Sequence, residues 1–158
     1  MPLPRLSIIA ATICIGACAT SPSDGFFALQ AVAEPLLEDV CPNANVSVES
    51  VRNPHVPDLV DRIETKNCVG ASVRTYISTA ASDPTGLPMS LELSKPNPRL
   101  PHYMNIGQAV GPLVAKLGTP SSMTSNVVVY SAPESEDSVT FNLANDRVVS
   151  IRWDWYVD

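Results

Sequence analysis

The stretch SVTFNLANDRVVSIRWDWY, residues 138–156, predicts a β-hairpin. Apolar and polar residues alternate over 139–143, which is the period of a half-buried strand. Asn145 and Asp146 then form a two-residue turn signal, since both residue types tolerate a positive φ. The returning segment is expected to place its apolar side chains on one face of a sheet: Val149, Ile151, Trp153 and Trp155.

Similar alternating runs predict further strands at 46–51, within 62–79, at 87–94 and at 126–132. Apolar residues at helical spacing predict a helix over 26–40, which Pro35 should kink or split. A second helix is expected to end at Gly118 in the left-handed conformation, with Pro120 preventing its continuation. Residues 96–103, which contain three prolines, read as a linker.

These elements predict an α+β fold with short helices packed on an antiparallel sheet. The first half, residues 26–95, reads as a helix followed by strands, and so does the second half, residues 104–158. Two α-β-β-β units that share one sheet are therefore one arrangement to test.

The amino end carries the features of an export signal. Arg5 precedes an uncharged apolar run that suits a signal peptide. The run is too short to span a bilayer, because a membrane-spanning helix needs about 20 residues. Ile15-Gly16-Ala17-Cys18 resembles the lipobox of bacterial lipoproteins. The resemblance implies a signal peptide over 1–17, acylation of Cys18 and a flexible tether over 18–25. It also implies a lipid-anchored protein of the cell envelope. Because Ala19 and not Asp follows Cys18, the resemblance implies the outer membrane, facing the periplasm. An ordinary secretory leader, with Cys18 incidental, is the alternative.

The net charge limits the partners, and the cysteine content fits an exported protein. The net charge of −6 disfavours nucleic acid and anionic lipid headgroups as partners. If Cys14 is removed with the leader and Cys18 is acylated, Cys41 and Cys68 remain, and two thiols in an oxidising compartment most simply pair as a disulfide. The alternative is a metal or redox pair, but neither cysteine has a ligand at metal-binding spacing.

The run IGQAVGPLVAKLGTP, residues 106–120, resembles the signature of the SmpA/OmlA-type lipoproteins, the small subunit of the β-barrel assembly machinery. The likeness rests on Ile106-Gly107, Leu113 and Leu117-Gly118-Thr119-Pro120, and it covers residues 104–158. The same helix-and-strands unit occurs twice in the β-lactamase inhibitory protein fold, whose disulfide arrangement Cys41 and Cys68 also resemble. The chain departs from the lipoprotein pattern at Ala109 and Pro112, and no partner motif carries over.

Catalytic and metal sites have little support in the sequence. His55 and His102 each lie beside proline in predicted loops, and no motif for a nucleophile with its base is present. Asp58 and Asp61 could share a helical face, but a solvated or capping cluster is favoured. The acidic run 134–137 fits no calcium loop and reads as a charged turn. We expect no cofactor and no metal.

The aromatic end is the best candidate for binding. Trp153 and Trp155 share a face of one strand, and Tyr156 follows. Either this face is core, or it is an exposed surface for a protein or glycan partner. We therefore expect a non-enzymatic, lipid-anchored protein that binds an envelope protein. A periplasmic inhibitor of a hydrolase, or a secreted enzyme with an unrecognised site, are the alternatives.

Overall fold

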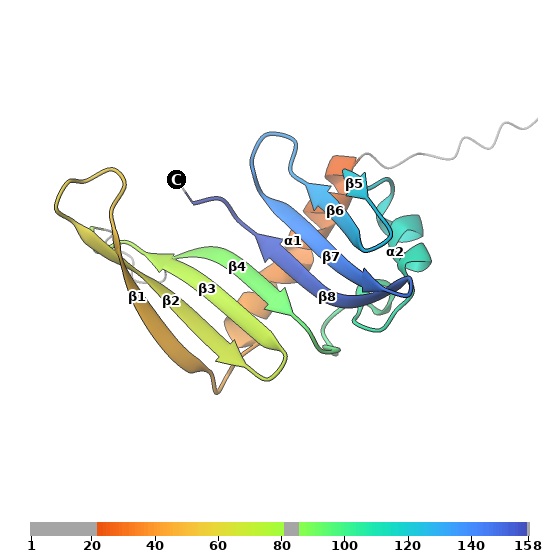
Figure 1. The fold of residues 1–158 in the computed structure, drawn as a ribbon, viewed down its shortest axis with the longest axis horizontal. Helices are drawn as coiled ribbons and strands as arrows, with labels where there is room; N and C mark the ends of the chain where they lie inside the picture. Colours follow the sequence, from red (N-terminus) through yellow and green to blue (C-terminus); the bar gives the residue numbers. More distant parts are fainter. Residues whose placement is uncertain (1–21, 81–85, 158) are drawn as a thin grey trace, which may run out of the picture.

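A computed structural model describes residues 22–80 and 86–157, which form one eight-stranded antiparallel sheet in the order β1-β2-β3-β4-β8-β7-β6-β5 (Figure 1). Two α-helices and a short 3-10 helix, η1, accompany the sheet in these ranges. The elements are α1 (Pro22–Asp39), β1 (Asn45–Arg52), β2 (Val60–Cys68), β3 (Ala71–Ile77), β4 (Leu87–Leu93), η1 (His102–Met104), α2 (Val110–Leu117), β5 (Ser122–Met123), β6 (Val127–Ser131), β7 (Ser138–Ala144) and β8 (Arg147–Asp154).

The predicted carboxyl-terminal hairpin is confirmed as β7 and β8. Asn145 and Asp146 form its turn, with φ of 50° and 57°. The predicted face of β8 is wrong at one position, because the register of the pair shifts between Asn142 and Leu143. This irregularity puts Val148 in the core, at 0% exposure, and leaves Val149 at 44%. Strict alternation in sequence cannot show where a strand takes up an extra residue.

The long helix α1 crosses one face of the sheet diagonally. It begins at Pro22, so residues 22–25 of the predicted tether belong to the helix, and Pro35 lies inside it without dividing it. Its buried residues recur at steps of three and four and contact the core: Phe26, Leu29, Ala33 and Leu36. Gly25 permits the close crossing, because a Cβ there would lie 2.7 Å from the carbonyl oxygen of Leu117.

The second helix, α2, ends as predicted at Gly118, but with a different backbone geometry. Gly118 has a φ of 83° and a ψ of −163°, so its φ is positive while its ψ is extended rather than left-handed helical. Leu113 and Leu117 are the buried residues of this helix. The Tyr130 hydroxyl donates a hydrogen bond to the Gly118 carbonyl oxygen at 3.1 Å, which links the end of α2 to β6.

The predicted α+β class, with its two α-β-β-β units, is wrong. The described residues form a mostly antiparallel, open sheet that is richer in β-structure than the prediction allows. One reason is that residues 60–77 form two strands, β2 and β3, joined by a tight turn at Val69 and Gly70. Another is that α1 lies against β4, β6, β7 and α2, so the helix of the first half packs mainly on the second half.

The strand farthest from α1, which is β1, has no helix over it. Figure 1 shows β1 and β2, which we call the wing, continuing beyond the end of α1. Seven of the eight residues of β1 are exposed, and only Val51 is partly covered. The hydrophobic core therefore spans β3, β4 and β6–β8 under the two helices, and β1 is an uncovered extension of the sheet.

Candidate interaction surfaces

The aromatic end attaches β8 to α1. Trp153 is wholly buried, and its indole Nε1 donates to the carbonyl oxygen of Leu29 at 3.1 Å. Trp155 is half-buried, and its Nε1 donates to Gln30 Oε1 at 2.7 Å. Only Tyr156, at 58% exposure, presents most of its surface to solvent. Of the three predicted partner-binding residues, Trp153 is therefore part of the core and Trp155 is mainly a contact to α1.

A shallow groove lies beside Trp155, between α1 and the sheet. Two hollows of about 380 and 390 Å³ adjoin there and share Glu34, Leu37 and Pro88. Trp155 lines the first hollow, and Lys66 lines the second. The groove combines apolar walls with charges of both signs.

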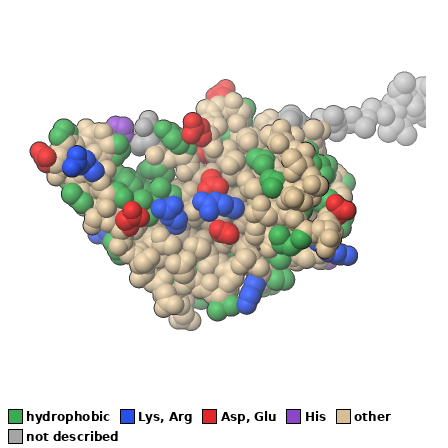
Figure 2. Space-filling model, in the orientation of Figure 1, with side chains coloured by type: hydrophobic (Ala, Val, Ile, Leu, Met, Phe, Trp, Pro, Cys, Tyr) green, Lys and Arg blue, Asp and Glu red, His purple; other side chains and the backbone are tan. Residues whose placement is uncertain are grey.

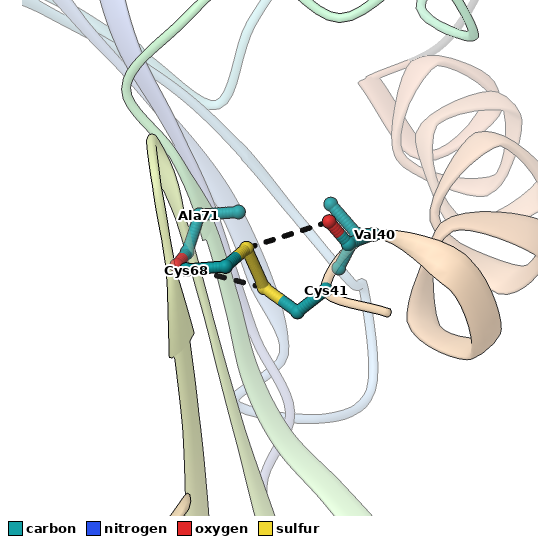
Figure 3. Close-up of a disulfide and its surroundings, with 4 residues drawn as sticks. All are labelled: Val40, Cys41, Cys68 and Ala71. Atoms are coloured by element: carbon teal, nitrogen blue, oxygen red, sulfur yellow. Dashed lines mark hydrogen bonds between the residues drawn. A yellow bond between two sulfur atoms is a disulfide. The ribbon is translucent and has the colours of Figure 1, made fainter. Parts of the chain in front are cut away.

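The predicted disulfide between Cys41 and Cys68 is confirmed, with the two Cα atoms 5.5 Å apart (Figure 3). It joins the end of the α1 segment to the end of β2, and so ties the helix layer to the wing. The Cys41 Sγ lies 3.7 Å from the Ala71 carbonyl oxygen, and the Cys68 Sγ lies 3.4 Å from that of Val40. Because sulfur carries no proton in a disulfide, these are close contacts and not donated hydrogen bonds.

Asp61 forms a polar cluster at the far end of the wing. Its side chain is buried, at 1% exposure of the residue, and accepts hydrogen bonds from the Tyr76 hydroxyl, from Asn53 Nδ2 at 2.6 Å and from the Thr79 backbone N–H at 2.7 Å. The bond from Tyr76 is the main reason why the pKa of Asp61 falls to about 2, and burial opposes this shift. The same bond raises the pKa of Tyr76.

The sequence pointed to a cluster at Asp58 and Asp61 but did not identify the residues that donate hydrogen bonds to Asp61. Asp61 lies on β2 and Asp58 lies in the preceding turn with a φ of 66°, so the two do not share a helical face. All the donors around Asp61 come from residues 53–79, which the β1–β2–β3 meander brings together. Because its oxygens are already occupied, Asp61 stabilises the end of the wing and is a poor candidate for a ligand site.

The face of the sheet opposite the helices is open and polar. Charged side chains of both signs gather across its middle (Figure 2). Arg152 Nε donates to both carboxylate oxygens of Asp154, at 2.8 and 2.9 Å, and Nη1 lies 3.5 Å from Glu92 Oε2. The bond to Asp154 raises the pKa of Arg152. These side chains are about two-fifths exposed, so the network is a solvated surface feature.

The two edges of the sheet differ sharply in length. The β5 edge consists of only two residues, Ser122 and Met123. The β1 edge runs for eight residues, without a bulge in its pairing to β2 and without proline. Val46 and Val48 are 54% and 60% exposed on the side of this strand that faces the helix layer. Short edges are protected against pairing with other strands, and long, regular edges are not.

The remaining candidate residues lie apart from one another. His55 is exposed in the loop between β1 and β2, and His102 is exposed at the start of η1. Asp137, in the predicted acidic turn, accepts a hydrogen bond from the Tyr156 backbone N–H at 2.7 Å and so holds the last segment of the chain. Residues 22–80 and 86–157 contain no group of three or more His, Cys, Asp or Glu that could hold a metal ion.

Cys18 and the rest of the predicted lipobox lie outside the described residues. Within the described ranges, neither helix is both long and apolar enough to cross a membrane. No family model, no curated protein and no solved structure matches this chain.

Proposed function

We propose that this chain is a lipid-anchored protein of the bacterial cell envelope, and that it acts by binding another protein rather than by catalysis. The disulfide between Cys41 and Cys68 carries the first part of the proposal. Such a bond persists in exported proteins and is rare in the reducing cytosol. It agrees with the export features of residues 1–17 and with the lipobox that ends at Cys18.

The open sheet supports the second part of the proposal. The described residues place a polar face, an uncovered wing and a groove at the surface. Broad, accessible surfaces of this kind suit protein contacts. Because Trp153 is core and Trp155 contacts Gln30, Tyr156 is the aromatic side chain of the terminal segment that we propose for partner contact.

The outer membrane, facing the periplasm, is the location we propose. The residue after Cys18 is Ala19. It is not an acidic residue, which would resemble a signal for retention in the inner membrane. The likeness of residues 104–158 to the SmpA/OmlA-type lipoproteins points to the same membrane, and it rests on the motif alone. Several acyl chains are needed for a firm anchor, since one chain holds a protein only marginally.

Metabolic labelling with a palmitate analogue tests the anchor. Cys18→Ala should abolish both the label and recovery in the membrane fraction. Cys14→Ala is the matched control, because it removes a thiol from the same leader and should leave the label unchanged. Label retained in Cys18→Ala, or lost equally in both variants, would contradict the proposal.

Affinity isolation from envelope extracts tests partner binding. Tyr156→Ala should weaken recovery of a specific protein while leaving the fold intact, because the side chain is largely exposed. Lys116→Ala, an exposed position on α2, is the control and should not change recovery. A hydrolase recovered with this chain, and inhibited by it, would favour the inhibitor alternative instead.

A further inference from the structure

The free backbone groups of β1 can be assigned residue by residue. The Asn53 N–H donates to the Leu59 carbonyl oxygen at 2.9 Å, and this pair continues the register of β1 with β2. In an antiparallel ladder, hydrogen-bonded pairs alternate with non-hydrogen-bonded pairs. The residues of β1 whose N–H and C=O point away from β2 are therefore Val46, Val48, Ser50 and Arg52. We call this row the β1 edge.

The β1 edge is suited to accept another strand. Its N–H and C=O groups point away from β2 in a regular row. Its side chains lie on the uncovered helix-side face, where Val46 and Val48 are more than half exposed. The residues on its other face include one charge, Glu49. The geometry points to a second copy of this chain as the occupant, with the two β1 strands antiparallel about a two-fold axis.

Charge selects the register of that pairing. A register centred on Glu49 would pair all four residues of the β1 edge, but it would place two carboxylates directly opposite each other, which is destabilising. A register centred on Ser50 would place Arg52 opposite Val48 and bring Pro54 to the end of the ladder. A register centred on Val48 avoids both: Val48 faces its own copy, Val46 faces Ser50, and Glu49 faces Ser47.

A two-fold axis perpendicular to the sheet keeps the helices of both copies on the same side. The exposed valines of the two wings then meet and cover one another on that side. Pairing over residues 45–51 buries less than a standard interface of about 1,600 Å². We therefore expect a reversible dimer. A common membrane would strengthen it by raising the effective concentration. The inference does not depend on the anchor, because β1 is the same with or without lipid at Cys18.

Cysteine cross-linking tests the pairing and its register on the full chain, purified in detergent with fewer chains than micelles. Val48→Cys should form a covalent dimer on mild oxidation, because facing Cα atoms would lie about 5.5 Å apart, within disulfide range. Ser50→Cys is the matched control on the same strand and face, because its copies would lie roughly 14 Å apart. No dimer with Val48→Cys, or equal dimer with both variants, overturns the inference.

Sedimentation equilibrium gives an independent measurement on the chain without an introduced cysteine or cross-linking. Val48→Pro removes an N–H that β2 does not use, so it should fold and stay monomeric at concentrations where the parent chain dimerises. Val48→Lys keeps the N–H and sets two ammonium groups opposite each other, and should also be monomeric. Val48→Thr is the control and should still dimerise. A parent chain that is monomeric throughout, or a Val48→Lys variant that dimerises like the parent, overturns the proposal.

Discussion

Trp153 donates its indole N–H to the carbonyl oxygen of Leu29, across 124 residues of sequence, and thereby joins β8 at the centre of the sheet to α1 above it. The ring is wholly buried, so the contact combines a large apolar surface with a satisfied polar atom. The sequence left open whether Trp153 is core or part of an exposed surface, and the structure places it in the core, where it joins the last strand of the sheet to α1.

Trp153→Phe should lower the free energy of unfolding by about 1 to 3 kcal/mol, because it leaves a cavity and removes the hydrogen bond. Urea unfolding followed by circular dichroism measures the change. Trp155→Phe is the control. Because that ring is only half-buried, this variant should lower the free energy of unfolding by less. Equal costs for the two variants would show that Trp153 is not the main attachment of α1.

Replacing both Cys41 and Cys68 with alanine should destabilise the protein by about 3 to 4 kcal/mol on the loop-entropy model. The bond closes a loop with a sequence separation of 27 residues, which gives the unfolded chain much freedom when the bond is absent. Chemical denaturation of the parent, with and without a reductant, should give the same difference. A parent chain that is insensitive to reductant would mean that the thiols are not paired in the folded protein.

Asp61 should make the stability of the protein depend on acid. Its folded pKa of about 2 lies below the ordinary value of 3.8, so its contribution is present above pH 4 and is lost as the pH falls toward 2. Unfolding measured from pH 7 to pH 2 should show Asp61→Asn less stable than the parent at neutral pH, with the difference shrinking in this window. A constant difference at all these pH values would contradict the assignment.

Tyr76→Phe tests the cause of that shift. The Tyr76 hydroxyl makes the largest contribution to the lowered pKa, so its removal should move the titration of Asp61 upward. Carboxyl chemical shifts in a pH titration report this directly. Thr140→Val, on the opposite half of the sheet, should leave the titration of Asp61 in place.

Asp146→Gly should stabilise the protein by up to about 1 kcal/mol, because glycine adopts a positive φ without the strain of a side chain. Asp146 has a φ of 57° in the turn between β7 and β8. Thermal unfolding measures the gain, and Asp146→Ala should instead destabilise. A destabilising glycine would show that the aspartate side chain contributes to the turn in a way its backbone does not require.

Local chemistry made much of the fold predictable. The turn at Asn145 and Asp146 and the end of α2 at Gly118 depend on backbone preferences of the residues themselves, and both appear where expected. The disulfide was predicted from the number of cysteines and from the oxidising compartment that the sequence leads us to expect. These features could be predicted because they depend on short segments or on the number of cysteines, and not on how the rest of the chain packs.

Long-range packing accounts for what the sequence did not reveal. Nothing in residues 22–39 indicates that α1 lies against β6 and β7 of the second half as well as against β4. The shift that buries Val148 and exposes Val149 arises from the pairing with β7. The cluster around Asp61 could not be found because Asn53, Tyr76 and Thr79 meet only when three strands are aligned.

The short β5 strand sets a limit on assembly. A two-fold pairing through β1 would consume the long edge of each copy and leave only two-residue edges at the ends of the joined sheet. A third copy would find no ladder long enough to extend, so growth stops at two chains and a fibril cannot follow. The protein would thus have one sheet edge that can pair with another strand and one that is too short to do so, which limits edge-to-edge pairing to two chains.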